Sequence, residues 1–198
     1  MEKVEEIAQN RHYLNLLNTA RELFWKYGFK RVSIEEICSK AGTSKMTFYR
    51  FFSNKIEIAK AVYEREISRS QIAFRNLLEA TDLTTAEKIR KMIQMKVDGT
   101  HDVSPEFLQD FYTNPDIGLK EYIETETWKV WNTVIDDFRK AQDKGIFRKD
   151  FKPEVFFRMA QQVLPLLNDK SITGLYNSPA ELIIDVTNLM VYGIIPHD

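Results

Sequence analysis

The chain has 198 residues, of which 43% are hydrophobic and 29% charged, with a formal net charge of −1. This composition suits a folded protein with a core and argues against a disordered chain. No apolar run reaches the roughly 18–20 residues of a membrane span, and the acidic N-terminus is unlike a secretory signal peptide. The single cysteine, Cys38, excludes a disulfide framework. The sequence therefore predicts a soluble, cytoplasmic protein with no membrane partner.

The small net charge hides an uneven distribution along the chain. Residues 1–75 contain 14 Lys and Arg against 9 Asp and Glu, a net charge of +5. Residues 76–198 contain 14 against 20, a net charge of −6. A basic N-terminal part on an acidic body indicates a negatively charged partner at one end, although a difference of this size also arises by chance.

Apolar residues recur every three to four positions, and the seven glycines and six prolines fall where helices should begin or end. This pattern predicts an all-α protein. Gly28 is a natural helix stop, and Ser33 with Glu36 has the spacing of a capping box. Pro165 should kink the helix that contains it. The expected helices span about residues 11–27, 33–40, 44–51, from a cap at Ser53 or Asn54 to 79, 85–98, 104–112, 115–143, 153–169 and 178–194.

The short helix at 44–51 has two chemically different faces. At 100° per residue, Phe48, Phe51 and Phe52 lie on one side, where other helices can cover them. The opposite side has Lys45, Met46, Tyr49 and Arg50, with Thr47 flanking them. Such a face suits the DNA major groove, because Arg binds guanine, Thr binds base edges, and Lys and Tyr bind phosphate. The alternative is a solvated helical surface with no partner.

The segment from Leu16 to Tyr63 resembles the N-terminal DNA-binding domain of the TetR family of bacterial transcriptional regulators. The likeness covers about 50 residues in order and without gaps. It is carried by Ala20, Leu23, Phe24, Gly28, residues 33–37, Ala41, Gly42, Ser44, Thr47, Tyr49, Phe52 and residues 53–55.

The resemblance implies a three-helix DNA-binding domain over residues 1–75, with the helix-turn-helix motif at about 33–52. Residues 33–40 would form the supporting helix and 44–51 the recognition helix. Met46 and Phe51 depart from the family pattern, which often has a small residue and a histidine there. The residues expected to contact DNA are Ser33, Thr43, Ser44, Lys45, Met46, Thr47, Tyr49, Arg50 and Lys55.

The resemblance also implies that residues 76–198 form a larger helical domain for effector binding and dimerisation. Aromatic residues and methionines suit an apolar ligand cavity, although a helical core would contain the same residue types. The predicted pocket lining is Met95, Phe111, Tyr112, Trp128, Trp131 and Met159. The last two helices have apolar stripes that fit either a dimer interface or an internal core.

Nothing in the sequence indicates catalysis, a cofactor or a metal. The three histidines, His12, His101 and His197, have no partners at metal-ligand spacing, and no phosphate loop or nucleophile motif is present. Cys38 lies on the inward side of its helix and is expected to be a core residue rather than a redox sensor.

The sequence therefore predicts a homodimeric, one-component regulator rather than an enzyme. It would bind double-stranded operator DNA and act as a repressor, released by a small and largely apolar effector. Two other classes stay open. One is a helical ligand carrier or enzyme with a vestigial helix-turn-helix, and the other is an adaptor that binds protein through Lys45, Tyr49 and Arg50.

Overall fold

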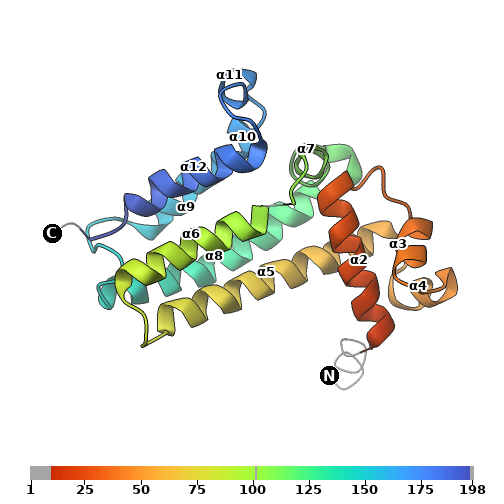
Figure 1. Ribbon diagram of the computed structural model, residues 1–198, viewed down its shortest axis with the longest axis horizontal. Coiled ribbons are helices and arrows are strands. Elements are labelled where there is room, and N and C mark those ends of the chain that lie inside the picture. The colour runs from red at the N-terminus through yellow and green to blue at the C-terminus, as the bar shows by residue number, and fades with distance from the viewer. Residues whose placement is uncertain (1–9, 101, 197–198) are drawn as a thin grey trace. The chain divides into compact units, whose positions relative to one another are not determined.

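The computed structural model describes residues 10–100 and 102–196, and every regular element within these ranges is helical (Figure 1). The prediction of an all-α fold is therefore confirmed. None of the described helices is long and apolar enough to cross a membrane. In chain order the elements are α2 (Arg11–Tyr27), α3 (Ile34–Lys40), α4 (Lys45–Phe51), α5 (Lys55–Glu79), α6 (Thr85–Thr100), α7 (Pro105–Leu108), the π-helix η1 (Gln109–Thr113), the 3-10 helix η2 (Pro115–Ile117), α8 (Lys120–Asp143), α9 (Pro153–Gln161), α10 (Val163–Leu166), α11 (Lys170–Thr173) and α12 (Pro179–Tyr192).

Helices α2 to α5 begin where side-chain caps satisfy their free N–H groups. The carbonyl oxygen of the Asn10 side chain accepts from two amides of α2, and the Ser33 and Ser44 hydroxyls cap α3 and α4. Of the two caps proposed for α5, the structure selects Asn54, whose Oδ1 accepts from Ile56 N at 2.9 Å and Glu57 N at 3.0 Å. These boundaries agree with the prediction because caps depend on nearby sequence.

Three of the longer predicted helices are interrupted. The 104–112 segment is a short helix followed by η1, and 115–143 begins as η2 before α8. The 153–169 helix stops at Gln161 and resumes at Val163. Proline at 165 supplies no N–H, and its ring would clash with the carbonyl of Gln161 in a continuous helix. The expected kink is thus a break one turn before the proline.

The chain forms two compact units, and each unit consists of two separate stretches of sequence. The first contains residues up to Ile67 together with Ser104–Glu126, and the second contains Ser68–Val103 and the chain from Thr127 onward. The division into a DNA-binding part, 1–75, and an effector part, 76–198, is a functional assignment that stays a prediction. The core of the first unit includes Leu16, Phe24, Ile37, Phe48, Ile58 and Phe111, and that of the second Leu78, Ile89, Phe138, Phe147 and Val191.

Candidate DNA-binding surface

Two short helices joined by a tight turn pack against α2 in the first unit (Figure 1). Ile37 of α3 and Phe48 of α4 are completely buried. The turn contains Gly42 at φ 62°, a conformation that favours glycine, and the Thr43 amide donates to the Cys38 carbonyl at 2.9 Å. This is the arrangement of a helix-turn-helix, in which α3 supports α4.

The two faces of α4 are divided as predicted. Phe48 and Phe52 are buried, and Tyr13 of α2 stacks on Phe52 with ring centroids 5.3 Å apart. Phe51 is partly buried at the edge of this cluster, 5.5 Å from the Tyr13 ring. On the other side Met46 is 80% exposed and Tyr49 55% exposed. An apolar side chain so exposed on a helix is available to contact a partner.

Lys45 and Arg50 add positive charge to the exposed face of α4. Both side chains are exposed, and Lys45 forms an ion pair with Glu35 of α3. The hydrogen bond from Lys45 lowers the pKa of the Glu35 carboxyl and raises that of the ammonium. Arg50 has no ion-pair partner within residues 10–100 and 102–196, so its guanidinium is available for a phosphate or a guanine.

The hydroxyl groups of the predicted contact set also have local partners. Ser33 Oγ accepts from the Glu36 amide at 3.1 Å, and Ser44 Oγ accepts from the Thr47 amide at 3.1 Å. Thr43 Oγ1 lies 3.0 Å from Nδ1 of His12 at the start of α2. Ser33 Oγ acts here as an acceptor, so its O–H can still donate to a phosphate, as can that of Thr43 when His12 Nδ1 donates to it. Ser44 Oγ also lies 3.0 Å from Thr47 Oγ1, so one of these two hydroxyls donates to the other and the second can donate to a phosphate.

The ammonium of Lys55 is engaged within the chain. It donates to the carbonyl oxygens of Phe29 at 2.8 Å and Val32 at 2.7 Å, and lies 4.2 Å from the centre of the Phe29 ring. Burial lowers its pKa, whereas the nearby Asp110 carboxylate raises it. The third acceptor near this ammonium, the Lys30 carbonyl oxygen, lies at 3.5 Å. Because an ammonium has three donors, the phosphate contact expected from the resemblance would replace this long contact or one of the two shorter hydrogen bonds.

The six residues predicted to line an effector pocket have different surroundings. Phe111 is completely buried in the first unit, in a cluster with Phe24, Trp25, Phe29 and Phe107, and Tyr112 follows it. Burial raises the pKa of the Tyr112 hydroxyl. In the second unit Trp131 packs against Trp128 and Phe157, and Met95 is partly buried. Trp128 and Met159 are 40% and 57% exposed.

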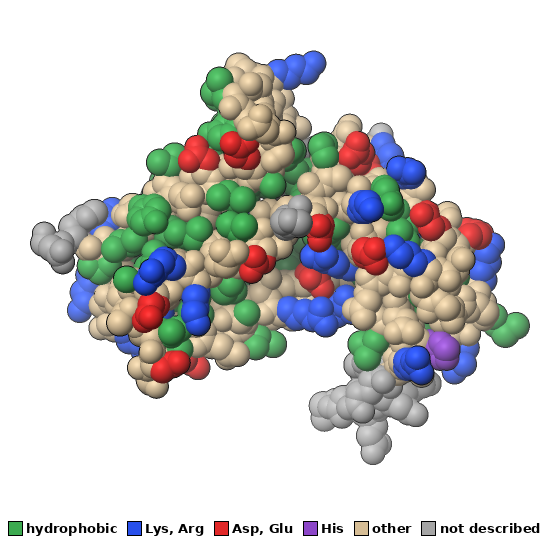
Figure 2. Space-filling model, viewed as in Figure 1, with side chains coloured by type: hydrophobic (Ala, Val, Ile, Leu, Met, Phe, Trp, Pro, Cys, Tyr) green, Lys and Arg blue, Asp and Glu red, His purple; other side chains and the backbone are tan. Residues whose placement is uncertain are grey.

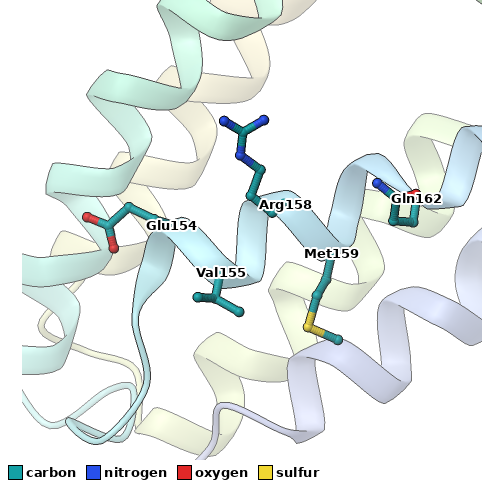
Figure 3. A pocket seen from close by; sticks show the side chains of 5 residues that line it. All are labelled: Glu154, Val155, Arg158, Met159 and Gln162. Carbon is teal, nitrogen blue, oxygen red and sulfur yellow. The ribbon is translucent and has the colours of Figure 1, made fainter.

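A hollow of about 310 Å³ lies along α9, and the residues that line it come from that helix and from Gln162, which follows it (Figure 3). They are Glu154, Val155, Arg158, Met159 and Gln162. Val155 and Met159 are more than half exposed, as are Leu189 and Tyr192 of α12, which packs beside α9. Figure 2 shows hydrophobic side chains gathered over this part of the second unit. Among the described residues, the lining of this hollow comes from one short segment, residues 154–162.

The structure shows two contacts near the helix-turn-helix that were not predicted from the sequence. They are the His12 ring against Thr43, and the Asp110 carboxylate against the loop after α2. Both join residues more than 30 positions apart, so a pattern within one helix could not reveal them.

The remaining candidates have ordinary structural surroundings. Cys38 is 4% exposed, and burial raises the pKa of its thiol, which makes it less reactive. Within the described ranges no cluster of His, Cys, Asp and Glu could hold a metal ion. His101 and His197 lie outside the described residues.

Residues 16–62 match the family model described as bacterial regulatory proteins, tetR family. The chain is 42% identical over 55 residues to the transposon Tn10 TetC protein of Escherichia coli, a match that covers 28% of each chain. It is 25% identical over 183 residues, 91% of each chain, to an uncharacterized HTH-type transcriptional regulator, YdgC, of Bacillus subtilis.

The fold is shared with solved structures over nearly the whole length. The fatty acid degradation regulator FadR of Bacillus halodurans superposes with a TM-score of 0.65 at 19% identity. The match covers 93% of this chain and 97% of that protein.

Proposed function

Because the chain belongs to the TetR family of bacterial transcriptional regulators, we propose that it is a homodimeric, one-component repressor. It binds double-stranded operator DNA through α4 and is released by a small, largely apolar effector. No cofactor is required, and the protein acts in the cytoplasm, where its DNA is. Regulation is its function, rather than turnover of a substrate.

The observation that carries this proposal is the exposed face of α4. Met46, Tyr49 and Arg50 point away from the core formed by Phe48 and Phe52, and Lys45 lies beside them. Arg can read guanine through two hydrogen bonds, and the Met46 side chain suits a thymine methyl group. Lys, Tyr and the hydroxyls of Ser44 and Thr47 suit phosphate oxygens, which set the position of the helix on the duplex.

The apolar surface of α9 and α12 supports the dimer. Val155, Met159, Leu189 and Tyr192 expose more than half of their surface to solvent. The same surface on a second copy would cover the hollow along α9 by an isologous, two-fold contact. A two-fold dimer then presents two copies of α4 to half-sites about 34–36 Å apart.

The effector would act by preferring one arrangement of the dimer over another. A ligand can change operator affinity only by the difference in its own affinity for the two arrangements. The candidates for its contacts stay Met95, Trp128 and Trp131 in the second unit and Phe111 and Tyr112 in the first. Met159 is better suited to the dimer surface because of its exposure on α9.

Fluorescence anisotropy with the DNA upstream of the protein's own gene tests the proposal. We expect sequence-selective binding that weakens steeply with salt. Tyr49→Ala, which removes a phosphate contact, should bind more weakly. Lys144→Ala, which removes an exposed cation in the second unit, is the control. Binding that is absent at low salt, or equal for unrelated DNA, would refute the regulator and favour a ligand carrier or adaptor.

A further inference from the structure

The loop between α2 and α3, residues 28–32, is held by two opposite charges from distant parts of the chain. Oδ2 of Asp110, in η1, accepts from the Lys30 amide at 2.8 Å. Nζ of Lys55, at the start of α5, donates to the carbonyls of Phe29 and Val32. The negatively charged carboxylate accepts a hydrogen bond from an N–H of the loop, and the positively charged ammonium donates to two carbonyl oxygens of the loop. We call this pair the loop clamp.

Asp110 is buried in this position. Its side chain is 6% exposed, although carboxylates are rarely buried without a partner. Gly28, at φ 77°, brings the loop so close that an added Cβ would lie 2.8 Å from Asp110 Oδ2 and 2.9 Å from Glu106 Cβ. Glycine is thus required at this position for two reasons, the backbone conformation and the space.

The segment that contains Asp110 is fastened to α2 at further points. The Ser104 amide donates to the Trp25 carbonyl at 2.9 Å, and the Trp25 and Phe107 rings lie 4.2 Å apart. Figure 1 shows α7 beside the end of α2. Phe111, one residue after Asp110, packs against Phe29 of the loop. The register of α7 and η1 on α2 therefore determines where the carboxylate meets the loop.

The loop leads directly into the helix-turn-helix. Val32, whose carbonyl Lys55 binds, is followed by Ser33, the N-cap of α3. Because α3 and α4 pack together through a fixed turn, the direction in which the chain leaves residue 32 sets the placement of α4 on α2. A displacement of α4 by about 1 Å exceeds the tolerance of about 0.5 Å within which binding residues must be held.

We propose that Asp110 is a positioning residue for DNA binding, although it lies outside the matched family domain at 16–62. Residues 104–113 complete the DNA-binding unit by holding the loop that aims the helix-turn-helix. This inference rests on the proposed function, because its effect is measured as operator affinity. The state of the loop itself can be measured without DNA.

The test compares Asp110→Ala, Asp110→Asn and Glu106→Ala in the full-length protein. Glu106→Ala removes the same charge one turn away but keeps the Cβ that packs on Gly28, so it is the matched control. For Asp110→Ala we expect amide exchange in residues 28–32 to accelerate at least tenfold, with unchanged exchange in α12. Operator affinity should fall about tenfold, since the Lys30 amide loses its partner. Asp110→Asn keeps an acceptor oxygen, so its operator affinity should fall only about threefold.

The possible outcomes distinguish an effect of the loop clamp from a general loss of stability. They also distinguish failure of the clamp from failure of the proposed function. Glu106→Ala should keep both wild-type exchange in the loop and wild-type affinity. Unchanged loop exchange and affinity in folded Asp110→Ala would overturn the proposal, as would equal losses in Glu106→Ala. If Asp110→Ala does not fold, loop exchange in Asp110→Asn decides, with acceleration expected and wild-type exchange overturning the role of Asp110. If wild-type protein binds no operator, the proposed function fails, while loop exchange still decides whether the clamp exists.

Discussion

The exposed faces of α4 and α12 both bear apolar side chains, but they differ in the residues that surround those side chains. On α4, Met46 and Tyr49 are interleaved with Lys45 and Arg50, and the helix contains no acidic residue. On α12, Leu189 and Tyr192 lie within residues 186–196, which contain no charged residue. The cations on α4 fit a polyanion, which also accepts contacts with apolar side chains. The uncharged surface on α12 fits an apolar protein partner.

A charge introduced on the α12 face should have the largest effect. Leu189, 70% exposed, would be buried in the proposed dimer, and Leu189→Glu would place two like charges across a two-fold axis. An unpaired buried charge costs about 3 kcal/mol or more, so the dimer dissociation constant should rise roughly 100-fold. Sedimentation equilibrium measures this constant.

Ile72→Glu provides the control for that experiment. Ile72 is 60% exposed on α5, in the same unit but outside α9 and α12. The Ile72→Glu substitution should leave the dimer dissociation constant unchanged. A Leu189→Glu protein that stays as dimeric as Ile72→Glu would remove the distinction between the two faces.

Removal of the unpaired cation on α4 should have the next largest effect. Arg50→Ala should weaken operator binding by about 1–3 kcal/mol, roughly 5- to 150-fold, and relax selectivity at one base position. Anisotropy titrations against the operator and its single-base variants measure both quantities. Lys144→Ala removes an exposed cation elsewhere and should bind like wild type. Equal effects of the two variants would mean that net charge, not the α4 face, determines binding.

The hydrogen bond between His12 and Thr43 should have a smaller effect. It holds the Thr43 hydroxyl beside the N-terminus of α4, at 3.0 Å from the ring nitrogen. His12→Phe removes this partner, and a net hydrogen bond of about 1 kcal/mol corresponds to roughly fivefold weaker operator binding. In the Thr43→Val background the same substitution should have no further effect, which a double-mutant cycle measures. Additive losses would contradict a coupled role.

The ion pair between Glu35 and Lys45 should have the smallest effect, with the opposite sign. Both side chains are exposed, so the pair is weak, and Glu35→Gln should free the ammonium and strengthen operator binding about two- to threefold. The dependence of binding on salt should become steeper by about one counterion. Glu36→Gln removes an adjacent charge that does not pair with Lys45 and serves as the control. Weaker binding by Glu35→Gln would show that the pair orients Lys45 for DNA.

Sequence predicts well the features that depend on neighbours along one helix. The helical class, the cap at Ser33 and the two faces of α4 follow from spacing alone, and the structure agrees with each. The contact residues and the pocket lining stay predictions. Exposure on α4 is compatible with the predicted contacts, because Met46, Tyr49 and Arg50 lie at the surface as expected.

Features that depend on tertiary packing could not be predicted in the same way. The position of the Lys55 ammonium results from carbonyls more than 20 residues away, and Asp110 meets an amide 80 residues away. The break after Gln161 depends on Pro165, whose effect on the preceding turn was underestimated as a kink. The apolar stripes of α9 and α12 can be read from the sequence, but the sequence does not show whether the same chain covers them. The structure shows that Met159 and Leu189 are exposed.

Selection of binding sites from random duplex DNA tests the central claim most directly, because it needs no knowledge of the regulated genes. Wild-type protein should enrich a two-fold symmetric site whose half-sites are one helical turn, or a whole number of turns, apart. Arg50→Ala, selected in parallel, should lose preference at matching positions of both half-sites. Failure to enrich any sequence, or enrichment of a site that Arg50→Ala selects equally well, would contradict DNA reading by α4.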